Sequence, residues 1–150
     1  MNKRTFFVDF DSGRLTDSIG GTSLTSPSLV AGSKPTLQFQ FLSWEDNVAT
    51  APDLSDGIKW RCVVDTDLSV STEPMGVCTS TDAITSGITS GYVAFPIDCT
   101  ASGFIDKVNG KDSIPAWLEI YGLDEDDIPI YDYRLKVNCL GTIEVNHTES

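Results

Sequence analysis

Residues 115–139 read PAWLEIYGLDEDDIPIYDYRLKVNC, and this stretch decides the fold because two alternating runs flank a cluster of acids. Apolar residues alternate with polar or aromatic ones over 116–121, and again over 131–139. A period of two is typical of a β-strand with one buried face. The stretch therefore predicts a hairpin, with residues 122–129 as its loop and the acids 124–127 at a solvated tip.

The same period of two recurs along the chain, at residues 5–10, 35–44, 58–65 and 92–99, and a short strand is predicted at 76–79. Each long run is expected to turn one set of side chains toward a common core: Phe6, Val8, Phe10, Leu37, Phe39, Phe41, Ile58, Trp60, Cys62, Val64, Val93, Phe95, Ile97, Cys99, Ala116, Leu118, Ile120, Tyr131, Tyr133, Leu135, Val137 and Cys139. The pattern predicts a mainly all-β fold, an antiparallel β-sandwich.

One short helix is predicted after the fourth of these runs. Thr100 is a candidate N-cap, and Phe104, Ile105 and Val108 fall on one helical face. The Asn-Gly pair at 109–110 supplies a C-terminal stop.

The chain is predicted to be a single domain over residues 1–150, with a core from about 5 to 140 and a short tail at 141–150. A chain of 150 residues can bury roughly 70% of the surface that its unfolded form exposes. Residues 11–28 are rich in Gly and Ser and are expected to form a surface loop.

Four cysteines are spaced too widely for a zinc or C-x-x-C redox site: Cys62, Cys78, Cys99 and Cys139. Two disulfides are arithmetically open to them. We expect reduced thiols that pack as small hydrophobic side chains.

The charge of the chain argues against nucleic acid as a partner. Ten Lys and Arg stand against 22 Asp and Glu, which gives a formal net charge of -12. Such a surface repels phosphate backbones and anionic lipid. The apolar run Phe6, Phe7, Val8 stops at Asp9, short of the roughly 7–15 residues that a signal peptide needs, and no segment approaches the roughly 18 needed to span a bilayer. We therefore expect neither a signal peptide nor membrane insertion.

No catalytic residue, metal ligand or cofactor site is assigned from the sequence. The acids 124–127 lack the ligand register of a calcium loop, and His147 near the chain end is the sole imidazole. Paired carboxylates for glycoside hydrolysis would need a spacing that sequence does not give. The interpretation of the acids as a solvated turn is preferred.

Four aromatic residues occupy the faces of their predicted strands opposite the core: Trp44, Tyr92, Trp117 and Tyr121. They are candidates for stacking on sugar rings or for anchoring a protein interface. The alternative is that the sheets are covered on both faces, which would make these side chains ordinary packing.

The segments that carry a family resemblance are, in order, LVAGSKPTLQFQFL, GIKWRCVV, YVAFPIDCTASGFIDKVNGK and AWLEIYG, followed by the acidic hairpin into IYDYRLKV. The order of the segments resembles the immunoglobulin-like N-terminal domains of phage tail-fibre and baseplate upper proteins. The resemblance covers residues 5–140. It implies an immunoglobulin-like β-sandwich that docks onto a tail or baseplate, often as a trimer. The resemblance implies no catalytic residues.

The resulting hypothesis is a non-enzymatic structural protein of a phage virion, made in the host cytoplasm, that docks other virion proteins at the tail, baseplate or fibre attachment. A homo-oligomer is expected. Two alternatives stay open: a carbohydrate-binding or adhesion module that uses the exposed aromatics, and a small glycan-active enzyme that uses the acidic loops.

Overall fold

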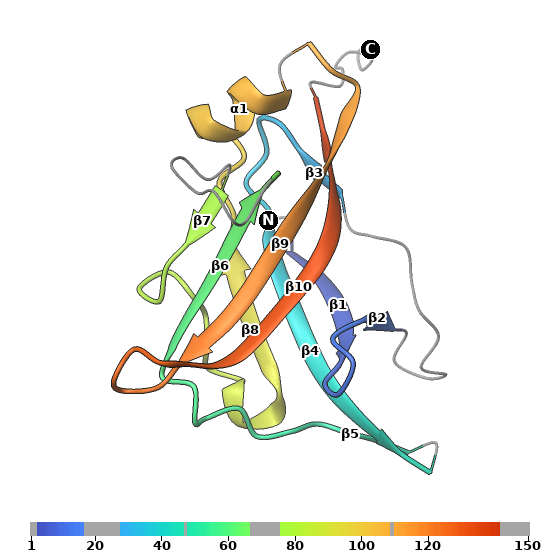
Figure 1. The fold of residues 1–150 in the computed structure, drawn as a ribbon, viewed down its shortest axis with the longest axis vertical. Helices are drawn as coiled ribbons and strands as arrows, with labels where there is room; N and C mark the ends of the chain where they lie inside the picture. Colours follow the sequence, from blue (N-terminus) through green and yellow to red (C-terminus); the bar gives the residue numbers. More distant parts are fainter. Residues whose placement is uncertain (1–2, 17–27, 47, 67–75, 109, 142–150) are drawn as a thin grey trace.

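Two five-stranded sheets make up most of the part of the protein that the structure describes (Figure 1). A computed structural model describes residues 3–16, 28–46, 48–66, 76–108 and 110–141. Its elements are β1 (Lys3–Asp9), β2 (Leu15–Thr16), β3 (Ser28–Val30), β4 (Thr36–Glu45), β5 (Val48–Thr50), β6 (Lys59–Asp65), β7 (Gly76–Cys78), a 3₁₀ turn η1 (Ile88–Ser90), β8 (Tyr92–Pro96), α1 (Ser102–Val108), β9 (Ser113–Leu123) and β10 (Pro129–Leu140). The all-β class with one short α-helix is confirmed.

The strand order shows that both sheets are mixed. In the first sheet the order is β2-β1-β4-β5, with β8 also paired to β4, and in the second it is β3-β10-β9-β6-β7. β1 pairs with β4 in parallel, and β3 pairs with β10 in parallel. These two parallel pairs depart from the mainly antiparallel sandwich that the sequence predicts, while the other strand pairs are antiparallel. Neither pair is joined by a tight turn, and only a tight turn forces antiparallel pairing.

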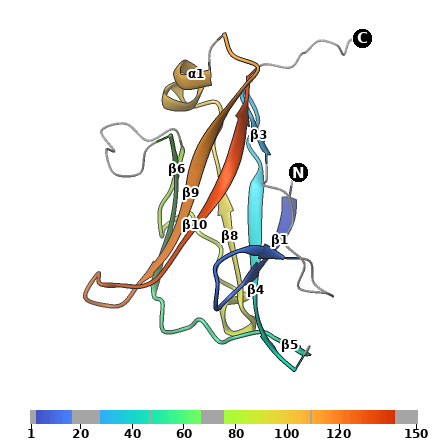
Figure 2. The same ribbon diagram turned by 45° about the vertical axis from the view of Figure 1, so that its right-hand side comes forward.

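One hydrophobic core lies between the two sheets, which face each other in Figure 2. Buried side chains from β4 and β8 meet those from β6, β9 and β10. Aromatic rings bridge the layers, since the rings of Phe41 and Tyr133 lie 4.9 Å apart. The Tyr133 hydroxyl also donates a hydrogen bond to the Phe10 carbonyl at 3.1 Å. Burial of the Tyr133 ring raises the pKa of its hydroxyl to about 12, so this donor keeps its proton at neutral pH.

The predicted core is largely confirmed, with Ile58 as the error. Most of the residues predicted to face the core are buried, and Phe6, Phe10, Tyr131 and Tyr133 pack half-buried against it. Ile58 is 58% exposed because β6 begins one residue later. The alternating pattern therefore starts one residue before the strand does.

Two polar side chains that alternate with the predicted core residues are buried, although alternation places them on the outer faces. Gln40 is covered near η1, where its amide donates to the carbonyls of Phe41 and Ser90 at 2.9 and 3.0 Å. Asp65, at the end of β6, is 1% exposed and accepts a 3.0 Å ion-pair hydrogen bond from Lys107 of α1. Tertiary neighbours cover both positions.

The loop and helix predictions need smaller corrections. β2 lies inside the predicted loop 11–28, whose residues 17–27 are outside the described part. The helix is present, but it begins at Ser102, and the Thr100 hydroxyl donates to the Asp98 side chain rather than capping the helix. The predicted tail falls almost wholly on residues 142–150, which are also outside the described residues.

All four cysteines are buried thiols. Cys62 on β6 and Cys78 on β7 are direct cross-strand partners. Burial raises the pKa of the Cys78 and Cys139 thiols to about 12, which keeps both neutral and poorly reactive.

Candidate functional site

The outer face of the second sheet carries laterally paired polar and aromatic side chains. On β9, the residues at 116, 118, 120 and 122 are buried, whereas Trp117, Glu119 and Tyr121 turn to the other face. Tyr121 stands between Arg61 of β6 and Asp132 of β10 in the strand register. The alternation predicted for β9 thus builds this face directly.

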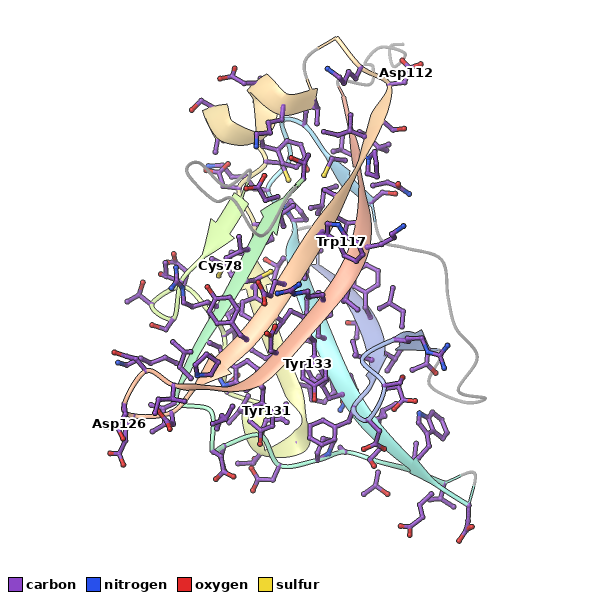
Figure 3. The ribbon with its side chains drawn as sticks, in the orientation of Figure 1. Cys78, Asp112, Trp117, Asp126, Tyr131 and Tyr133 are labelled. Atoms are coloured by element: carbon purple, nitrogen blue, oxygen red, sulfur yellow. The ribbon has the colours of Figure 1, made fainter. Side chains whose placement is uncertain are left out.

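Each aromatic ring on this face has a cation over it. The Lys136 ammonium lies 5.5 Å from the ring centre of Trp117, and the Arg61 guanidinium carbon lies 5.5 Å from that of Tyr121. Such contacts are worth about 0.5–1 kcal/mol at exposed sites. Burial raises the pKa of the Tyr121 hydroxyl, so it stays a neutral hydrogen-bonding group at physiological pH. Figure 3 shows Trp117 on β9.

Between the two rings, Glu119 forms a small carboxylate network. Its Oε2 accepts from the Arg134 Nε at 3.4 Å. Partial burial, followed by hydrogen bonding and like charge from Asp132, nevertheless raises the pKa of Glu119 above its ordinary 4.5.

This network gives the protein a predicted pH dependence. Because Glu119 holds its proton more tightly when folded, the folded state binds more protons than the unfolded state above about pH 4.5, and stability falls as pH rises through the raised pKa of Glu119. Glu119→Gln should remove this loss, an effect of up to about 1 kcal/mol for a network near the surface. Urea unfolding of both proteins from pH 4 to 7 measures it. Asp132→Asn should lower the Glu119 pKa part of the way in an NMR titration, because burial still raises it. A Glu119 pKa that does not change in this variant contradicts the contribution assigned to Asp132.

The acids between β9 and β10 turn the chain, as predicted. Asp124 Oδ1 accepts hydrogen bonds from the backbone N–H groups of Asp126 and Ile128 at 2.8 and 3.0 Å. Asp127 adopts a left-handed conformation with φ of 62° and forms an ion pair with Lys59. Asp126 lies at the tip of the loop in Figure 3, away from the sheet. A short polar side chain tolerates this geometry, which accounts for an Asp-rich turn at this position.

A groove of about 570 Å³ runs along this face beside the hairpin. We call it the Arg61 groove; it is lined by Lys59, Arg61, Thr79, Ser80, Tyr121, Leu123, Asp127 and Pro129. Among the described residues, the Arg61 Nε is buried without a hydrogen-bond acceptor. A buried donor left unpaired costs about 1–3 kcal/mol.

Three strongly exposed isoleucines surround the same end of the second sheet. Ile58 is 58% exposed, Ile128 54% and Ile130 42%. The Ile58 N–H donates to the Leu123 carbonyl at 2.7 Å, which places it beside the hairpin that carries the other two. These isoleucines with the loop 124–128 are called the hairpin end below.

The structure separates the four predicted aromatic candidates. Trp117 and Tyr121 share the outer face of β9. Tyr92 lies on β8 of the first sheet, where it lines a smaller hollow of about 260 Å³ with Ile84 and other residues. Trp44 is half-buried near the end of β4, and its buried Nε1 has no acceptor among the described residues.

Sequence reasoning missed the Arg61 groove. The available signal is that Lys59 and Arg61 alternate with the predicted core residues Trp60 and Cys62. Thr79 and Ser80 follow β7, and only the pairing of β7 with β6 brings them to that face. Within the described ranges, the structure contains no cluster of three or more His, Cys, Asp or Glu that could hold a metal ion, and no helix of the length and apolarity needed to cross a membrane.

No protein-family model matches the chain, and no curated protein matches its sequence. Among solved structures, the fold is similar to the N-terminal domain of phage TP901-1 ORF48, with a TM-score of 0.49 and 8% sequence identity over 94% of this chain and 98% of that one. At that identity and TM-score, the likeness by itself assigns neither activity nor partner.

Proposed function

We propose that the protein is a non-enzymatic structural component of a phage virion, at the tail, baseplate or fibre attachment, and that it docks another virion protein through the hairpin end. The observation that carries the docking surface is the concentration of Ile58, Ile128 and Ile130 beside the Arg61 groove. The order of sequence segments that resembles phage tail-fibre and baseplate domains supports the virion as its place.

The exposed apolar area of these isoleucines favours contact with a partner. Fully burying one isoleucine is worth about 1.5–3 kcal/mol, so three of them beside a groove make a favourable contact when a partner covers them. Net charge of -12 opposes association of the protein with other copies of itself before that partner arrives. A homo-oligomer, a trimer included, therefore needs a partner or a complementary surface to overcome this repulsion.

The test is incorporation into particles. We expect the unaltered protein in the mass spectrum of purified virions. Phage carrying Ile58→Ser, Ile128→Ser and Ile130→Ser together should yield particles with at least tenfold less of it. Val48→Ser, which alters a 61% exposed apolar residue on the β4–β5 hairpin, is the matched control and should incorporate normally.

Both arms can contradict the proposal. Absence of the unaltered protein from particles removes the virion role. Normal incorporation of the triple variant removes the hairpin end as the docking surface. Circular dichroism of each purified variant confirms that a loss of incorporation does not come from unfolding.

A second candidate function is carbohydrate binding, favoured by one observation. Trp117, which is 38% exposed, and Tyr121 present two rings on one face of β9. A sugar would have to displace Lys136 or Arg61 from these rings. Trp117→Ala should abolish retention of the protein on intact host cells if glycan binding is its role, whereas incorporation into particles should not change.

A further inference from the structure

The geometry points to the Arg61 groove as a site that binds one carboxylate, carried by an acidic residue with apolar neighbours in a peptide segment of the docking partner. This inference rests on the proposed function and names the chemistry of the partner.

Arg61 carries the positive charge of the groove that no carboxylate of the described residues pairs with. Lys59 is already paired with Asp127 inside the groove. Lys107 is paired with Asp65, and Arg134 is paired with Glu119. Arg61 has no carboxylate partner among the described residues, although it lies against the ring of Tyr121. The head group is thus held in place while its charge stays unpaired.

The net charge of the groove indicates the charge of the ligand. Two cations and one anion line the groove, which leaves one net positive charge. A planar guanidinium presents donors that match the two oxygens of a carboxylate. A phosphate dianion would be left half-compensated inside a chain whose formal charge is -12. A singly charged carboxylate fits this balance.

The other lining residues indicate what surrounds the carboxylate. Thr79 and Ser80 supply hydroxyls that can bond a peptide backbone. Leu123 and Pro129 supply apolar walls at the side of the hairpin end. A volume of about 570 Å³ falls within the range of about 300–1,000 Å³ typical of binding sites for small ligands. A short acidic segment with apolar flanks therefore suits the groove.

The experiment uses the full chain labelled with ¹⁵N and the peptide N-acetyl-Leu-Asp-Leu-amide as the probe. We expect saturable shifts of the Arg61 Nε–H signal and of the Thr79 and Ser80 amides, with a millimolar Kd. The matched peptide with Asn in place of Asp, and inorganic phosphate, should each bind at least tenfold more weakly.

Variants assign the binding to the guanidinium. Arg61→Gln should weaken the Asp peptide at least tenfold, and Arg61→Lys should weaken it several-fold because charge remains but the planar fork is lost. Arg134→Gln removes a cation from the same sheet face outside the groove and should leave binding unchanged. Thermal unfolding of each variant verifies its fold.

Three outcomes overturn the inference: equal binding of the Asp and Asn peptides, tighter binding of phosphate, or unchanged binding by Arg61→Gln. Each is independent of the particle test. Normal incorporation without peptide binding would reject the carboxylate site alone, whereas peptide binding by a protein absent from particles would leave the site and remove the virion role.

Discussion

Trp60→Ala should lower the free energy of unfolding by about 4 kcal/mol, within the range of about 3–5 measured when a buried aromatic is truncated. Trp60 is 1% exposed, and its ring stacks on Tyr131 with 5.5 Å between centroids and 13° between planes. Its Nε1 donates to the Gly57 carbonyl at 2.8 Å. Truncation therefore leaves a cavity, an unpaired carbonyl and a loosened hairpin end. Urea unfolding followed by circular dichroism measures the loss.

A matched control separates burial from residue type. Trp117→Ala removes the same side chain from a 38% exposed position and should lower stability by less than about 1 kcal/mol. A loss below about 1.5 kcal/mol for Trp60→Ala would contradict the packing described here. If Trp60→Ala does not fold, the free energy of unfolding of Trp60→Phe is compared with that of the unaltered protein. This variant keeps most of the side-chain volume.

The glycines around Trp60 offer an independent check. A Cβ on Gly122 would lie 2.9 Å from the Trp60 ring, and one on Gly57 would lie 2.7 Å from it. Gly122→Ala should therefore destabilise the protein by overpacking, an effect of about 1–3 kcal/mol. The penalty should shrink in the Trp60→Phe background, because a smaller ring leaves room for the methyl group.

Lys107→Met should lower the free energy of unfolding by about 3 kcal/mol, the low end of the effect of breaking a buried ion pair. Asp65 is 1% exposed, and Lys107 supplies its ion-pair partner at 3.0 Å. The second oxygen of Asp65 is buried without a hydrogen bond among the described residues, so loss of Lys107 leaves a poorly compensated buried charge. The Lys107 side chain is 38% exposed, and solvent therefore weakens the ion pair. For this reason we expect a loss of stability at the low end of the range for buried ion pairs.

A double variant distinguishes charge from lost packing. Asp65→Asn with Lys107→Met removes both charges and should recover most of the stability, since a neutral amide needs no counterion. Chemical denaturation of the single and double variants gives the coupling energy. If the double variant is no more stable than Lys107→Met, the stabilisation comes from packing of the lysine stem and not from the ion pair.

The strands of the hairpin and of the inner core could be predicted because they depend on local alternation. Side chains of a strand point to opposite faces in turn, so the apolar positions of β4, β9 and β10 show which face is buried. The turn at Asp124 also depends on near neighbours, since its side chain bonds backbone N–H groups two and four residues later. The local pattern failed at Ile58, where alternation begins one residue before the strand.

Features that need distant neighbours could not be read from the pattern. Asp65 carries the signature of an exposed position, and its burial depends on a helix that begins at Ser102. The Arg61 groove requires β7 beside β6, and its pairing leaves no periodic trace in the Ser- and Thr-rich sequence around it. Periodicity likewise contains no information on strand direction, which is why the parallel pairs were missed.

By itself the sequence determined the all-β class, the acidic hairpin and which side of most strands is buried, because these follow from the two-residue repeat of an extended chain. Only the tertiary structure decided that the sheets are mixed, that Asp65 is covered, and that Arg61 lies in a groove beside three exposed isoleucines. Those features arise from contacts between residues far apart in the chain, and a one-dimensional pattern does not specify which distant segments meet.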